Sequence, residues 1–286
     1  MLMNMKDLLT IARENHFAVP AFNISDYAMF NGVMKACLEE NAPVIIEIHP
    51  HELSFTGNDI TASIISYANR VRIPVVLHLD HGDSFESCMN AIKCGFTSVM
   101  IDASSKSFEE NIAITKKVVE AAHAVNVSVE AELGTIGVTT SKEAYENQTI
   151  LYTKVEDAVE FIKQTDVDTL AVAIGTSHGL YPKGMTPHLR LDILQDIYHA
   201  VDIPLVLHGG SGNPDEEIHE CVNYGVAKIN ISSDIKHAYF VKMREVLQNE
   251  ALREPNKIEP ACIEEVVKVV KHKIHLMNDQ DKAKLY

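Results

Sequence analysis

Short runs of apolar residues alternate with longer amphipathic stretches along the whole chain. The short runs are almost continuously apolar rather than alternating with polar positions, which is typical of parallel strands that are buried on both faces. Their length and β-branched content favour strands over buried helices. The pattern predicts eight strands, at Phe17–Phe22, Val44–Ile48, Ile73–Leu79, Ser98–Ile101, Val127–Glu132, Thr169–Ile174, Ile203–Leu207 and Val226–Ile231.

Amphipathic stretches of helical period lie between these strands. They predict helices at Tyr27–Glu40, Ile60–Arg70, Phe85–Cys94, Phe108–Ala124, Val155–Lys163, Leu191–Ala200 and Asp215–Tyr224, after a first helix near the amino terminus. Eight alternations of strand and helix without a long linker indicate an α/β protein, a (β/α)8 TIM barrel. We expect one domain over residues 1–286.

Two extra helices are expected after the last strand, over about Asp234–Asn249 and Ala261–Met277, with a break at residues 251–260. The carboxy-terminal helical extension is expected over about residues 250–286. The last helix carries an apolar set that suits a barrel cap or a dimer contact, namely Ile263, Val266, Val267, Val270 and Ile274.

Charge and cysteine usage narrow the class of protein. The 286 residues include 25 Lys and Arg against 40 Asp and Glu, a formal charge of −15, which disfavours nucleic acid and anionic membranes as partners. No run of about 18 apolar residues predicts a membrane span. Five cysteines without a CxxC pair, together with no cleavable leader pattern, favour a reducing cytoplasm.

Polar residues stand where the predicted strands end, which is where barrel enzymes place their active sites. Three of them are histidines from three different strands, His81, His178 and His208. Three imidazoles at one rim can bind one zinc ion at about 2.1 Å and leave a position open for substrate. The other polar strand-end residues are Asn23, Asp80, Asp102, Glu132, Asn230, Ser232 and Ser233.

Asp80 directly precedes His81, so we expect its carboxylate beside the metal, either as a proton shuttle or as a partner that orients an imidazole. Asp102 and Glu132 are auxiliary candidates, which would orient the histidines or hold an alternative metal position. His49 and His51 follow the second strand and can line the substrate mouth.

Glycine-rich turns follow the sixth, seventh and eighth strands, where such barrels bind phosphate through backbone N–H groups. Gly179, Gly209, Gly210 and Ser211 belong to these turns. The polar stretch from Gly134 to Tyr152 is expected to be an active-site loop or, alternatively, a decorative insertion. Lys228 shares a strand face with Asn230, which allows Schiff-base chemistry or, alternatively, a buried ion pair.

This constellation resembles the class II, metal-dependent fructose-bisphosphate and tagatose-bisphosphate aldolase family across essentially the whole chain. The matching segments are Val19–Ile24, Leu77–Glu86, Ser98–Ser104, Val129–Gly137, Leu170–Tyr181, Leu205–Gly212 and Ala227–Ser232. The resemblance implies that His81, His178 and His208 bind one Zn2+, that Asp80 is the acid/base, and that Asn230 steadies the enediolate.

The resemblance also implies which residues hold the sugar phosphate. Phosphate would lie at Gly179, Gly209, Ser211, Ser232 and Ser233, and Asn23, Gly210 and Lys183 complete the predicted substrate-binding set. A monovalent cation, Na+ or K+, is allowed nearby. An acid on the loop after the fifth strand, Glu143 or Glu146, would handle the C3 proton of the enediolate.

Several departures from the family pattern concern the substrate. Pro182 displaces the family lysine to Lys183, and a His49–Glu52 run replaces a small hydroxyl residue after the second strand. Ile263 falls where the family's last helix carries an arginine for the distal phosphate. We therefore hypothesise that the C1-phosphate end is kept and the distal end has changed.

The sequence thus predicts a cytoplasmic, zinc-dependent aldolase that cleaves a ketose 1-phosphate or 1,6-bisphosphate reversibly into dihydroxyacetone phosphate and an aldehyde. We expect a homodimer or homotetramer with a sugar phosphate as its small-molecule partner. Two alternatives stay open, a sugar-phosphate sensor without turnover and a Schiff-base aldolase acting through Lys228.

Overall fold

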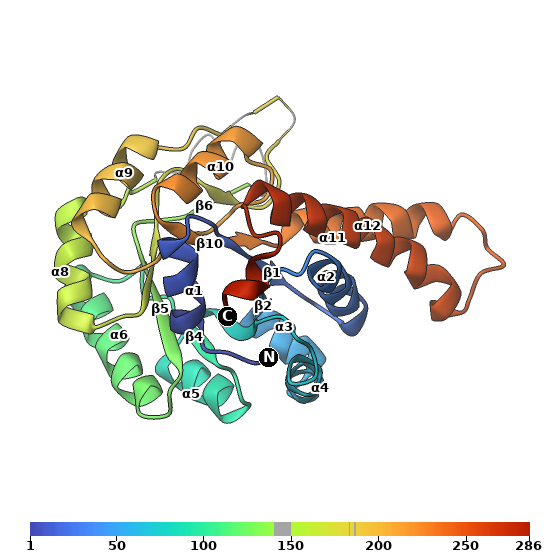
Figure 1. The fold of residues 1–286 in the computed structure, drawn as a ribbon, viewed down its shortest axis with the longest axis horizontal. Helices are drawn as coiled ribbons and strands as arrows, with labels where there is room; N and C mark the ends of the chain where they lie inside the picture. Colours follow the sequence, from blue (N-terminus) through green and yellow to red (C-terminus); the bar gives the residue numbers. More distant parts are fainter. Residues whose placement is uncertain (140–149, 183, 186) are drawn as a thin grey trace.

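A closed barrel of parallel strands forms the centre of the computed structural model, which describes residues 1–139, 150–182, 184–185 and 187–286 (Figure 1). Around the barrel the strand order is β1-β2-β3-β4-β5-β7-β9-β10, closing back on β1. These strands are β1 (Val19–Asn23), β2 (Val44–Ile48), β3 (Val75–Gly82), β4 (Ser98–Ile101), β5 (Ser128–Leu133), β7 (Thr169–Val172), β9 (Leu205–Leu207) and β10 (Val226–Ile231). The predicted TIM barrel is confirmed.

Helices surround this barrel and pack apolar side chains against it. They are α2 (Tyr27–Glu39), α3 (Pro50–Thr56), α4 (Asp59–Ala68), α5 (Phe85–Lys93), α6 (Phe108–His123), α8 (Val155–Thr165), α9 (Leu191–Ala200) and α10 (Asp215–Asn223). Helix α3 lies in a stretch that the sequence pattern left as a connection. Pro50 begins it, and His49 and Glu52 close a capping box around its first turn.

Helix α1 (Met5–Glu14) crosses the amino-terminal end of the barrel. Its buried residues Met5, Leu8 and Leu9 pack with apolar residues such as Val19 and Ile45 in a separate core cluster. This packing closes the lower end of the barrel, so the opposite end is the one open to a substrate.

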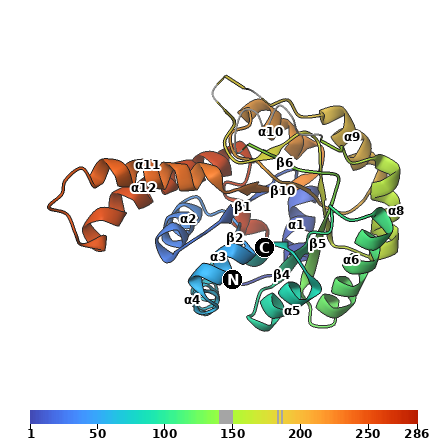
Figure 2. The same cartoon turned by 180° about the vertical axis from the view of Figure 1, so that it is seen from behind.

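Helices α11 (Ser233–Val246) and α12 (Pro255–Leu276) project from the barrel as an arm, visible from both sides (Figures 1 and 2). The chain then ends in a short 3-10 helix, η1 (Lys282–Leu285). The expected break over residues 251–260 is too long, because α12 already begins at Pro255. Proline at a first helical position loses no hydrogen bond, and Pro260 is accommodated inside the helix.

A second, two-stranded sheet of β6 (Gly137–Val138) and β8 (Ser177–His178) was not expected from the sequence. It joins the start of the loop after β5 to the turn that carries His178. Among the described helices, none combines the length and hydropathy that a membrane span requires.

Candidate active site

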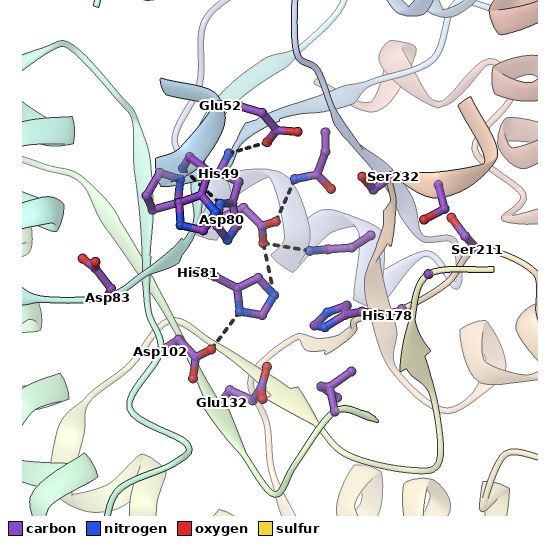
Figure 3. A pocket seen from close by; sticks show the side chains of 18 of the residues that line it. His49, Glu52, Asp80, His81, Asp83, Asp102, Glu132, His178, Ser211 and Ser232 are labelled. Carbon is purple, nitrogen blue, oxygen red and sulfur yellow. Dashed lines mark hydrogen bonds and ion pairs between the residues drawn. The ribbon is translucent and has the colours of Figure 1, made fainter. Parts of the chain in front are cut away.

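A pocket of about 950 Å³ opens at the carboxyl ends of the barrel strands (Figure 3). It brings together most of the residues that the sequence singled out, because the carboxyl ends of parallel strands meet at one rim. These lining residues are Asn23, Asp80, His81, Asp102, Glu132, His178, Gly179, Gly209, Ser211, Asn230, Ser232 and Ser233.

Three histidines lie together at this end of the barrel, of which His81 and His178 line the pocket and His208 is buried beside them. His81 lies near the end of β3, His178 ends β8, and His208 follows β9. Their ligand nitrogens all lie within 4.8 Å of one another. Nε2 of His81 and Nδ1 of His208 face each other at 2.9 Å. Strands that are far apart in sequence therefore aim three imidazoles at one point.

Carboxylates engage the outer ring nitrogens of two of these histidines. Asp102 contacts Nδ1 of His81 at 2.8 Å, and Glu130 contacts Nε2 of His208 at 2.7 Å. Such partners orient the ring and set which nitrogen carries the proton. His81 also has a φ of +47° at a bulge in β3, which turns its side chain along the rim.

Asp80 lies beside His81 and is 4% exposed. Its carboxylate accepts hydrogen bonds from Nδ2 of Asn23 at 2.7 Å and Nδ2 of Asn230 at 3.1 Å. Burial alone would raise the pKa of Asp80, but His81 and His208 outweigh burial and hold that pKa well below its usual range. Asp80 is therefore an ionised carboxylate, fixed at both oxygens.

Three carboxylates surround His81 and make this side of the pocket attractive to cations. Burial opposes a charge on His81, yet Asp80, Asp102 and Glu132 raise its pKa to about 10. Burial and the nearby charge of Asp102 raise the pKa of Glu132 to about 8. His81, Asp102 and Glu132 also form a second group with metal-ligand spacing, where the sequence placed its alternative position.

Two residues of the glycine-rich turns, Gly179 and Gly209, belong to the pocket lining. Gly179 has a φ of +109°, and a Cβ there would lie 2.2 Å from Oγ1 of Thr139. Gly209 has a φ of +63°, and a Cβ there would lie 2.7 Å from the carbonyl oxygen of Ser177. Side chains are excluded at both glycines, so the backbone itself borders the pocket.

Gly210 differs from the other predicted phosphate-binding residues. Its N–H donates to the carbonyl oxygen of Asn230 at 3.0 Å, and the residue does not line the pocket. Gly210 allows β9 and β10 to approach closely, because a Cβ would lie 2.5 Å from Cγ2 of Ile229. Its N–H is thus engaged within the barrel.

The side of the pocket near β2 contains residues that the sequence did not assign. Lys236 on α11 forms an ion pair with Glu52 on α3, and Glu52 also accepts from Oγ of Ser25 at 3.0 Å. His49 and His51 line the same side, as the sequence allowed. Ile263 lies elsewhere, on α12, packed against the core.

Lys228 is fully buried below the pocket. Its Nζ lies 2.8 Å from both Glu47 and Glu130, which is the ion pair that the sequence left as the alternative to Schiff-base chemistry. Sequence reasoning missed Glu47 and Glu130, and also His78. In the sequence, each of them is a charged or polar residue inside an otherwise apolar strand. Such a residue must find a buried partner.

Three sequence candidates, Glu143, Glu146 and Lys183, lie outside the described residues. Glu143 and Glu146 belong to the loop after β5, whose first described end is attached near the site, because Thr139 donates through its N–H at 2.9 Å and its Oγ1 at 2.8 Å to the carbonyl of His178. Leu151 donates to Oγ1 of Thr135 at the other end. The loop thus begins and ends at the pocket rim.

The donor set fits a divalent transition metal. Imidazole nitrogens suit zinc and its neighbours, and three protein ligands at a pocket floor leave room for a substrate oxygen. His81 and His208 already have their outer nitrogens engaged by carboxylates, which leaves the facing nitrogens as ligand atoms.

Comparison with known proteins agrees with this geometry. A family model described as fructose-bisphosphate aldolase class-II matches residues 3–282. A fructose-bisphosphate aldolase of Staphylococcus epidermidis is 39% identical over 288 residues, covering 99% of each chain. One of Thermus caldophilus is 36% identical over 305 residues, covering 99% of this chain and 100% of the relative.

Solved structures show the same similarity. The YdjI aldolase of Escherichia coli K12 has a TM-score of 0.88 and 35% sequence identity, covering 99% of this chain and 100% of that one. A putative fructose-1,6-biphosphate aldolase from Coccidioides immitis also has a TM-score of 0.88, with 27% identity and 98% coverage of both chains.

Proposed function

Because the chain belongs to the class II fructose-bisphosphate aldolase family and is a metal-dependent aldolase, a lyase, we propose that it cleaves a ketose 1-phosphate in the pocket at the barrel rim. The products are dihydroxyacetone phosphate and an aldehyde, and the reaction is reversible. The observation that carries the proposal is the convergence of His81, His178 and His208 beside the ionised Asp80.

In this proposal the three histidines hold one Zn2+ per subunit. A divalent metal bound there would polarise the ketose carbonyl as a Lewis acid and stabilise the negative charge that develops as the C3–C4 bond breaks. Asp102 and Glu130 hold two of the imidazoles in the required orientation. On the family resemblance alone, we add a monovalent cation, Na+ or K+, near the phosphate.

Asp80 removes the proton of the C4 hydroxyl in the direction of cleavage and returns it in the direction of synthesis. Its two oxygens are positioned by Asn23 and Asn230, so the acceptor does not have to reorient during the reaction. One N–H of the Asn230 amide is used by Asp80, which leaves the second to donate to the enediolate oxygen. Glu143 or Glu146 is our candidate for the C3 proton.

The phosphate of the substrate binds opposite Asp80, at the turns after β8, β9 and β10. Gly179 and Gly209 let the backbone approach the anion, and Ser211, Ser232 and Ser233 supply N–H and hydroxyl donors. Ser232 and Ser233 also begin the 14-residue helix α11, whose dipole favours an anion.

The distal end of the substrate carries no second phosphate in our proposal. On the side of the pocket near β2, the described lining offers a single amine, Lys236, and Glu52 already pairs with that amine. A second anionic group would find no free cationic partner there. A neutral polyol end fits the lining better, in line with the altered residues after β2.

The test is release of dihydroxyacetone phosphate from fructose and tagatose 1,6-bisphosphates and from ketose 1-phosphates, with and without a chelator. Chelator-sensitive release supports the aldolase, and no release from any substrate despite bound zinc would favour the sensor. Comparable kcat/KM for substrates with and without the distal phosphate supports the neutral end, whereas a preference of about a thousandfold for the bisphosphate, about 4 kcal/mol, would refute it.

Borohydride trapping separates this mechanism from the Schiff-base alternative. An imine through Lys228 would persist after chelation and leave a reduced adduct on that lysine. We expect none, because Lys228 is fully buried between Glu47 and Glu130.

We further propose a single domain, a homodimer or homotetramer, and a cytoplasmic location without nucleic-acid or membrane partners. The free thiols of all five cysteines and the charge of −15 support the location and the absence of polyanionic partners. Phe240, Val241 and Leu247 on the arm are each about half exposed, which supports a subunit contact there. Light scattering of the purified protein tests the assembly.

A further inference from the structure

A layer of charged and polar side chains fills the barrel axis directly below the three histidines. Glu47 comes from β2, His78 from β3, Glu130 from β5 and Lys228 from β10, and none of them is exposed to solvent. This layer does not line the pocket, so it has no place among the groups that contact a substrate.

Glu130 connects this layer to the metal site. Its Oε1 lies 2.7 Å from Nε2 of His208, and its Oε2 lies 2.8 Å from Nζ of Lys228. Lys228 is also 2.8 Å from Oε1 of Glu47. The ammonium therefore lies between two buried carboxyl groups, and one of them reaches the imidazole above.

The arrangement selects one tautomer of His208. A carboxylate paired with Lys228 is a hydrogen-bond acceptor only, so Nε2 of His208 must carry the proton that it donates to Glu130. Nδ1 is then the unprotonated nitrogen, and it faces Nε2 of His81 at 2.9 Å. Asp102 engages Nδ1 of His81 in the same way, so Nε2 of His81 is the nitrogen that faces His208.

We propose that Glu130 and Lys228 are positioning residues that hold His208 in its Nε2–H tautomer and so prepare its Nδ1 to bind the metal. Glu130 acts through His208, and Lys228 acts through Glu130 by fixing its charge and its orientation. The inference rests on the proposed role of His208 as a metal ligand.

The Glu130→Gln variant makes a specific prediction. With Lys228 in place, the amide oxygen of the new side chain turns toward the ammonium and the NH2 group turns toward His208. Nε2 of His208 must then accept a hydrogen bond, which moves the ring proton to Nδ1, the metal-binding atom. We expect zinc affinity to fall about 10- to 100-fold, the usual effect of losing such a partner.

Adding Lys228→Met to Glu130→Gln should restore part of that affinity. Without the ammonium, the amide is free to turn its oxygen toward His208, so the original tautomer returns. A merely structural role predicts the opposite, because a second buried substitution would add to the damage. The sign of this effect therefore separates positioning from packing.

Asp168→Asn is the matched control. Asp168 is a buried carboxylate between a lysine and a histidine as well, with Nζ of Lys6 at 2.9 Å and Nε2 of His123 at 2.8 Å, and it does not line the pocket. Its loss should lower thermal stability without changing zinc affinity.

Two measurements decide the question. Competition with a chromophoric chelator gives the zinc affinity of each purified variant, and 15N shifts of the histidine rings give the tautomer of His208 in chelator-treated protein. Wild type and the double variant should show the proton on Nε2, and Glu130→Gln should show it on Nδ1.

An unchanged tautomer in Glu130→Gln, a zinc affinity within about threefold of wild type, or a double variant weaker than the single one would each overturn the inference. An equal loss of affinity in Asp168→Asn would do so too. If wild type bound zinc poorly, the proposed function would fail, while the tautomer in chelator-treated protein would still decide the role of Glu130.

Discussion

Replacing Asp80 with asparagine tests the proposed chemistry most directly, and the structure sets the expected cost. The carboxylate accepts from Nδ2 of Asn23 on one oxygen and from Nδ2 of Asn230 on the other. Asparagine offers a single oxygen, so one of these buried amides loses its partner. Such a loss costs about 1–3 kcal/mol of stability.

The catalytic cost of Asp80→Asn should be larger. An amide cannot take the C4 hydroxyl proton, and a positioned acid/base contributes about 10²- to 10⁴-fold to turnover. At about 1.4 kcal/mol per decade, this is about 3–5 kcal/mol of transition-state stabilisation. Metal content should stay at the wild-type level, because His81, His178 and His208 are untouched.

The assay combines steady-state release of dihydroxyacetone phosphate with elemental analysis for metal and denaturant unfolding. Asp83→Asn is the control, since Asp83 lines the same pocket but is exposed and accepts a hydrogen bond from Oγ of Ser84. We expect its turnover within about twofold of wild type. Turnover of Asp80→Asn within tenfold of wild type would refute the proton-transfer role, and loss of the metal would make Asp80 a structural partner instead.

Three other changes have defined outcomes. Asp279 is fully buried with both carboxylate oxygens unpartnered among the described residues, and burial raises its pKa well above the usual value. Above about pH 4 the Asp279 carboxyl ionises only in the unfolded chain, so it lowers the stability of the folded state as the pH rises from there. Asp279→Asn should therefore lose less Tm than wild type between about pH 4 and 8, and equal losses would contradict this. Gly179→Ala must adopt a φ of +109° and meet Thr139, so we expect a lower Tm and a higher KM; unchanged KM would remove Gly179 from the phosphate site. Zinc at about 100 times its Kd should stabilise the protein by about 2.7 kcal/mol, reversed by chelator, and an unmoved Tm would argue against a site in the native state.

Much of the fold follows from local pattern. The bounds of β2, β4 and β10 match the prediction, because each is a short, mostly apolar run that contains β-branched residues. The errors have physical causes: β3 continues through a bulge to Gly82, where polar residues replace the apolar run. Helix α12 begins before its interior Pro260, which reads as a break in the sequence.

The site was predictable at the rim and not below it. His81, His178 and His208 stand at strand ends, and the barrel topology alone brings strand ends together. Glu130 and Glu47 lie inside strands, where pattern reasoning expects apolar side chains. Which buried charge pairs with which depends on the register between strands that are distant in sequence, and no local signal contains that register.

The strand period explains why the two layers belong together. Residues two apart share a face, so Asp80 stands above His78, Glu132 above Glu130, and Asn230 above Lys228. Each of these three rim residues thus has a charged or polar residue beneath it, where apolar packing would stabilise the barrel more. Buried charges are tolerated only when they are paired, as Lys228 is with Glu47 and Glu130. Removing Lys228 alone would leave two buried carboxyl groups without their cation, which costs more than removing a matched pair. The barrel therefore gives up stability along its axis in return for a rim whose imidazoles are already oriented.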